Sequence, residues 1–60
     1  MAIRNSERDV AIELRRKAQQ YRALARSIDD QRFADIAIKM SRACTARAQQ
    51  IEYELASRAA

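Results

Sequence analysis

The chain has 60 residues, of which 12 are Lys or Arg and 8 are Asp or Glu, and it contains no Gly, Pro or His and a single Cys. A chain of this length forms at most one small domain, 1–60, and the lack of Gly and Pro disfavours sheets joined by tight hairpins. Phosphate-binding Gly-rich loops, His-containing metal clusters, a Ser-His-Asp triad and an internal disulfide are excluded. We therefore expect no enzymatic activity, no cofactor, no metal and no small-molecule substrate.

The apolar runs are far too short to cross a membrane, since the stretch 36–38 holds only three apolar residues. The N-terminal residues lack the apolar core of a secretory signal, and Glu7, Asp9 and Glu13 argue against an organelle transit peptide. These features predict a cytoplasmic protein without a membrane partner.

The first half of the chain has the pattern of an amphipathic helix over about 6–28. Ser6-Glu7-Arg8-Asp9 is a capping-box variant with acids in the first turn. At about 100° per residue, the apolar residues that follow cluster on one face, around about 310°. This apolar stripe consists of Val10, Ala11, Leu14, Ala18, Tyr21, Leu24, Ala25 and Ile28.

The second half predicts another helix over about 31–57, because its apolar residues cluster around about 65°, out of phase with the first stripe by about 115°. Asp29-Asp30 lies between the stripes and is a good N-cap for the second helix. We therefore predict an all-α antiparallel two-helix hairpin; the alternative is a continuous or domain-swapped helix. The second stripe consists of Phe33, Ile36, Ala37, Met40, Cys44, Ala48, Ile51 and Leu55.

Folding the chain back at the aspartates pairs positions whose numbers sum to about 61 or 62, which places Ile28 beside Phe33 and Leu14 beside Ala48. One hairpin buries a stripe from each helix but leaves the far edge of each stripe in water. Because chains this short commonly gain stability by oligomerising, we predict a homodimer that forms a four-helix bundle.

Four apolar residues lie off the stripes: Ile3 and the three residues Ile12, Ile38 and Tyr53. Scattered apolar side chains are normal on protein surfaces, and this is the interpretation we favour. The alternative is that the three residues form an outer interaction patch for a protein partner or a higher oligomer.

The basic residues are unevenly distributed, and 10 of the 12 are Arg. On the predicted first helix, an Arg ridge flanks the apolar stripe; it consists of Arg4, Arg8, Arg15, Arg22 and Arg26. The ridge is either a solvated face that pairs with neighbouring acids or a surface that binds phosphate. Because no aromatic residues are interleaved with it, nucleic-acid binding would read the backbone of folded or double-stranded RNA, or of DNA, and would depend strongly on salt.

Cys44 lies at the centre of the second stripe, where a cysteine usually acts as a small buried apolar residue. The alternative is a redox-sensitive bridge across a dimer axis, which requires two copies of Cys44 to come close. Glu52 and Glu54 are two positions apart on a helix and so point in different directions, which argues against a catalytic pair.

Residues 14–56 resemble a widespread set of short bacterial helical-hairpin proteins. The resemblance is carried by Ala18-x-x-Tyr21-Arg22-x-Leu24-Ala25 and by Ala43-x-x-x-x-Ala48-x-x-Ile51-Glu52-x-Glu54-Leu55. It implies the fold more than a function, and this chain departs from the set in being basic. In architecture alone, the predicted dimer is also similar to the plasmid-copy-control RNA-binding bundle. Our leading hypothesis is a homo-oligomeric protein-interaction or regulatory module, and the alternative is a nucleic-acid binder that uses the Arg ridge.

Overall fold

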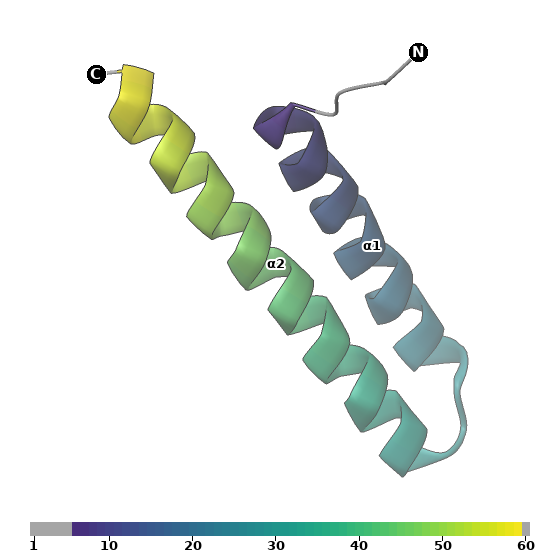
Figure 1. Ribbon diagram of the computed structural model, residues 1–60. Helices are drawn as coiled ribbons and strands as arrows, with labels where there is room; N and C mark the ends of the chain where they lie inside the picture. The colour runs from purple at the N-terminus through teal and green to yellow at the C-terminus, as the bar shows by residue number, and fades with distance from the viewer. Residues whose placement is uncertain (1–5, 60) are drawn as a thin grey trace.

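The computed structural model describes residues 6–59, which form two antiparallel helices, α1 (Glu7–Ser27) and α2 (Gln31–Ala59), joined by residues 28–30 (Figure 1). The predicted all-α hairpin is confirmed, and the continuous-helix alternative is wrong. The two helices lie side by side in a single layer, and the Cα atoms extend only 12 Å along the shortest axis.

Both helices begin at the polar residues that the sequence offers as caps. The Ser6 hydroxyl accepts a hydrogen bond from the Asp9 backbone N–H at 3.2 Å, and the Asp9 carboxylate accepts one from the Ser6 N–H at 3.4 Å. At the start of α2, the Asp30 carboxylate accepts a hydrogen bond from the Arg32 N–H at 2.9 Å. These contacts satisfy backbone donors that a helix N-terminus otherwise leaves free.

The connection between the helices is extended, which sets the register of the hairpin. Ile28 has φ −89° and ψ 125°, and no residue in 6–59 has the positive φ that would require glycine. Because the chain continues downward through this segment, α2 begins below the last turn of α1 (Figure 1). Phe33, which was predicted to pack beside Ile28, consequently remains 60% exposed.

Two ion pairs between the helices report this register directly. Arg15 pairs with Glu52, and Arg58 pairs with Glu7. The position numbers sum to 67 and 65, whereas the predicted layers summed to 61 or 62. The predicted pairing was therefore wrong by about one helical turn.

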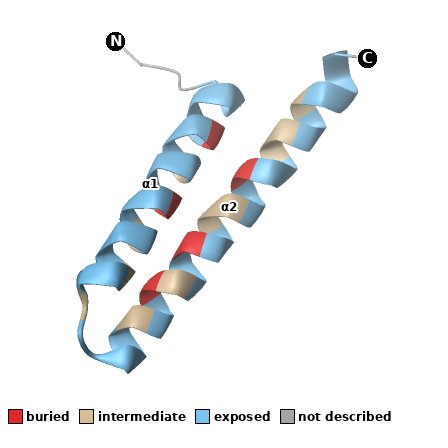
Figure 2. Cartoon of the chain, turned by 180° about the vertical axis from the view of Figure 1, so that it is seen from behind, coloured by how far each residue is buried: buried red, intermediate tan, exposed pale blue. Residues whose placement is uncertain are grey.

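Small residues form the contact between the helices (Figure 2). Ser41, which belongs to neither predicted stripe, lies in this contact, and its hydroxyl donates to the Ile38 carbonyl at 2.7 Å. A serine whose hydroxyl is satisfied within its own helix packs as a small residue. The buried residues in 6–59 are Ala11, Ala18, Ala37, Ser41 and Ala48.

The large apolar residues do not point at the opposite helix, which corrects the predicted core. On a helical wheel, the buried residues of α2 centre at about 120°, whereas the apolar stripe of α2 centres at about 65°. On α1 the buried residues are displaced from the apolar stripe in the same direction. In an antiparallel pair, offsets of the same sign turn both stripes toward the same side. Val10, Leu24, Phe33, Ile36 and Met40 are therefore exposed, by 39–60%.

Candidate interaction surfaces

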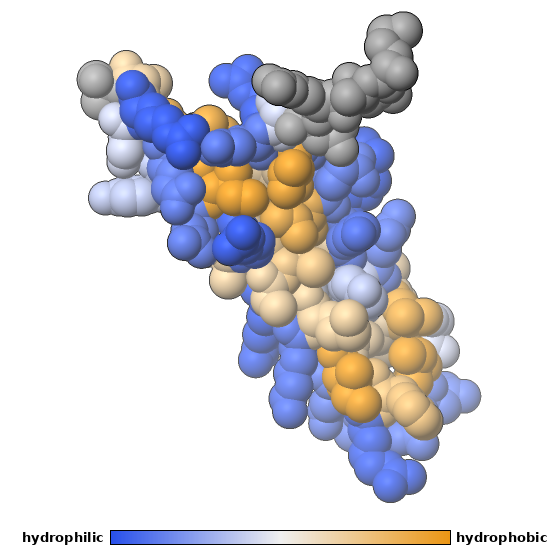
Figure 3. All heavy atoms as spheres, in the orientation of Figure 1, coloured by the Kyte–Doolittle hydropathy of each residue, from blue (hydrophilic) through white to orange (hydrophobic). Residues whose placement is uncertain are grey.

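One side of the hairpin, here named the apolar face, carries large hydrophobic residues from both helices. Figure 3 shows them gathered along the two helices and bordered by hydrophilic atoms. Leu14, Tyr21, Cys44 and Ile51 are half-buried at the inner edge of this face, beside the helix contact. The apolar face consists of Val10, Leu14, Tyr21, Leu24 and Ile28 together with Phe33, Ile36, Met40, Cys44 and Ile51.

The apolar face leaves large side chains in water. Leu24, Phe33, Ile36 and Met40 are 44–60% exposed. A group of exposed apolar residues with a polar border is typical of an interaction surface.

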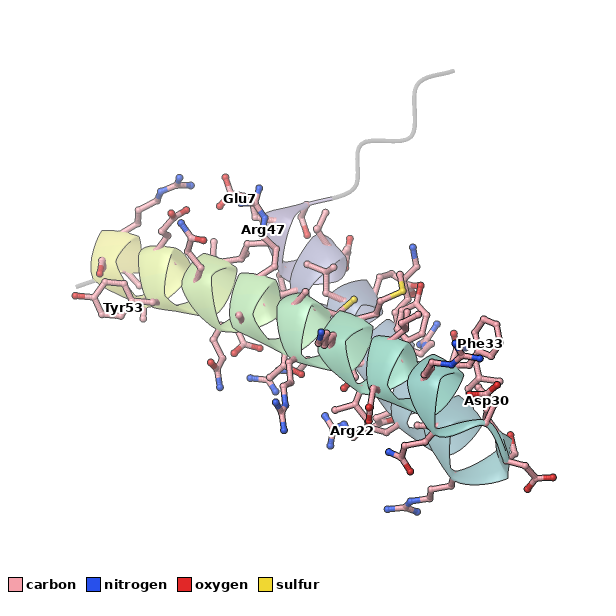
Figure 4. All side chains as sticks on the ribbon, turned by 90° about the horizontal axis from the view of Figure 1, so that it is seen from below. Glu7, Arg22, Asp30, Phe33, Arg47 and Tyr53 are labelled. Atoms are coloured by element: carbon pink, nitrogen blue, oxygen red, sulfur yellow. The ribbon has the colours of Figure 1, made fainter. Side chains whose placement is uncertain are left out.

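The opposite side, here named the Arg face, carries most of the predicted Arg ridge. In Figure 4, Arg22 and Phe33 project from opposite sides of the hairpin. Arg42 of α2, which the sequence did not place in the ridge, lines the same hollow as Arg22. Arg4 of the ridge lies outside the described residues. The Arg face consists of Arg8, Arg15, Arg22, Arg26 and Arg42.

Arg15 is held by a bidentate ion pair with Glu52. Its Nε and Nη2 donate to the two carboxylate oxygens at 2.7 and 2.6 Å. The hydrogen bond from Arg15 lowers the pKa of Glu52, and the Arg15 charge acts in the same direction while desolvation opposes it. The hydrogen bond to Glu52 likewise raises the pKa of Arg15. The Arg15 charge is therefore neutralised within the chain.

This ion pair predicts a loss of stability in acid. The pKa of Glu52 is lower in the folded state than its ordinary value of 4.5. The contribution of Glu52 to folding stability is therefore complete above pH 4.5 and is lost as the pH falls through the folded-state pKa. We expect the thermal midpoint to fall between pH 6 and pH 3, and to fall less in Glu52→Gln. Circular dichroism measures both, with Glu54→Gln as the control. An equal acid dependence in wild type and Glu52→Gln would show that the pair does not contribute.

The remaining arginines of the Arg face are not engaged in this way. Within residues 6–59, ion pairs join Arg16 to Glu13 and Arg32 to Asp30 in addition to the two that bridge the helices. None of them includes Arg8, Arg22, Arg26 or Arg42. Their guanidinium groups are exposed and available to an external anion.

The three residues of the predicted outer patch lie apart. Ile12, 50% exposed, borders a hollow with Arg8 and Glu52 near the chain ends. Ile38 is half-buried and borders a separate hollow with Arg22. Tyr53 is 75% exposed and borders neither hollow. The interaction patch formed by these three residues therefore stays a prediction.

Cys44 is a free thiol at the inner edge of the apolar face. It is half-buried rather than fully buried, because the helix contact is centred on Ala37, Ser41 and Ala48.

A scan of protein-family models and searches of curated proteins and of solved structures found no match to this chain. Neither helix, as described over residues 6–59, has the length of apolar sequence needed to cross a bilayer. In the same part of the chain, no three Asp, Glu or Cys side chains are grouped so that they could hold a metal ion.

Proposed function

We propose that this chain is a non-enzymatic helical interaction module that acts as a homodimer. In the dimer, the apolar faces of two hairpins pack against each other and form a four-helix bundle. The observation that carries the proposal is the exposure of Leu24, Phe33, Ile36 and Met40 on one side of a single-layer fold. A helical stripe is stable in water only when it is packed against another element.

A second copy fits this face better than an unrelated partner does. Two identical hairpins match in length, and a two-fold axis places the same apolar residues on both sides of the interface. Arg47 projects from the same side as Phe33 (Figure 4). It can keep its charge in water while its methylene groups cover the edge of the interface. A contact of this kind would supply the core that the small helix contact lacks.

The dimer is tested by a matched pair of substitutions, Ile36→Asp and Ile12→Asp. Each isoleucine is the sixth residue of its helix, and the two are 52% and 50% exposed, but only Ile36 belongs to the apolar face. Burying an isoleucine contributes about 2 kcal/mol, so Ile36→Asp should raise the dimer dissociation constant at least about thirtyfold. Ile12→Asp should leave it unchanged. Sedimentation over a concentration series measures both constants.

Two results would contradict the proposal. One is a wild-type chain that remains monomeric at high concentration, and the other is a dimer weakened by Ile12→Asp but not by Ile36→Asp. Helicity by circular dichroism establishes that each variant is folded.

A further inference from the structure

We propose that the Arg face binds the phosphate backbone of double-stranded nucleic acid, chiefly through Arg22, Arg26 and Arg42. This binding surface lies on the side opposite the proposed dimer interface, so it adds a second activity.

Two adjoining hollows bring these arginines together. The larger, about 420 Å³, lies between the helices, with Arg22 on α1 and Arg42 on α2 among its lining residues. The side chains of Ser41, Thr45 and Gln49 also line it and add polar groups. The smaller, about 200 Å³, is lined by Arg22 and Arg26 together with Gln19 and Ala23. Arg22 therefore stands between two hollows, each of which has a second arginine.

The charges around the hollows favour an anion. No Asp or Glu lines either hollow. Glu52 on this side is engaged by Arg15, and Asp35, which shares a face of α2 with Arg42, accepts a hydrogen bond from Gln31. A guanidinium group stays charged at all physiological pH values and binds phosphate oxygens in bidentate fashion.

The ligand is a duplex because the Arg face offers no aromatic platform. Proteins that bind single strands stack the bases on aromatic side chains. Phe33 projects from the opposite side of the hairpin (Figure 4), and Tyr53 borders neither hollow. Contacts to the backbone of a duplex require only charge and hydrogen-bond donors.

Three phosphate contacts fix the expected salt dependence. The logarithm of the association constant should fall with the logarithm of the salt concentration with a slope of about −2.7 on duplex DNA. Between 50 and 200 mM salt, the dissociation constant should therefore rise about fortyfold. Fluorescence anisotropy with a labelled 20-base-pair duplex measures the dissociation constant at each salt concentration. Comparing RNA and DNA duplexes of the same sequence identifies which of the two is the ligand. A single strand of that sequence is the third probe.

Matched variants locate the binding surface. Arg22→Gln and Arg42→Gln should each weaken binding about tenfold and reduce the salt slope by about one. Arg47→Gln removes the same charge from the opposite side and should leave binding unchanged (Figure 4). Glu52→Gln should strengthen binding and steepen the slope, because it releases Arg15 onto the Arg face.

Three outcomes would overturn the proposal. They are no binding of either duplex at 50 mM salt, an equal loss in Arg47→Gln and Arg22→Gln, and tighter binding of the single strand than of the duplexes. Sedimentation of each variant shows whether the dimer is preserved, so a failure of this proposal is distinguishable from a failure of the proposed dimer.

Discussion

Replacing Ala18 by Leu is expected to lower the free energy of unfolding by about 3 kcal/mol. Ala18 is fully buried where α1 contacts α2, as is Ala48 on the facing helix. Helix axes approach most closely where the facing side chains are small, so three additional carbon atoms must push the helices apart. For a domain of this size, the thermal midpoint should fall by roughly 12–24 °C.

Ala23→Leu provides the control for this substitution. Ala23 lies on the same helix but is exposed, so the added carbons meet solvent and helix propensity changes little. Thermal unfolding followed by circular dichroism compares the two variants. A similar midpoint in both would mean that the helices are not closely packed at Ala18.

Raising the chain concentration a hundredfold is expected to raise the thermal midpoint by about 10 °C. If the folded state is the proposed dimer, mass action stabilises it by about 2.7 kcal/mol over this range. For a pair of 60-residue chains that unfold together, each kcal/mol corresponds to about 4 °C. Calorimetry at a series of concentrations measures the shift.

The same measurement on Ile36→Asp serves as the control. Its midpoint should depend less on concentration, because the apolar face no longer pairs, whereas Ile12→Asp should behave as the wild type. A wild-type midpoint that is independent of concentration would rule out the coupling of folding to dimerisation.

The hairpin itself could be predicted because its determinants are local. Ser6 and Asp30 are strong caps, and their side chains bind the backbone N–H groups that capping requires. The phase difference between the two apolar stripes requires a break between them, and the chain does reverse at residues 28–30.

The register and the helix contact could not be predicted, because neither is a local property. The register depends on the extended backbone at Ile28, and periodicity carries no information about that conformation. Periodicity also marks every apolar position without saying which element it packs against. Ile36 and Ala37 are neighbours in one stripe, yet Ala37 is buried in the helix contact and Ile36 is exposed.

The Arg face was predictable in part. Arg15, Arg22 and Arg26 share a helix face through their spacing alone. The Arg15–Glu52 pair was missed because its members are 37 positions apart and meet only in the observed register. Arg42 was missed for the same reason, since it joins the ridge only across the helix contact.

The apolar and Arg faces lie back to back on one thin layer, and this arrangement constrains the assembly. Stacking two hairpins through their apolar faces turns both Arg faces outward, separated by two helix layers of about 10 Å each. One straight double helix cannot reach both of them at once. A dimer with both proposed activities would therefore be bivalent and would tether two separate duplex segments, one on each side.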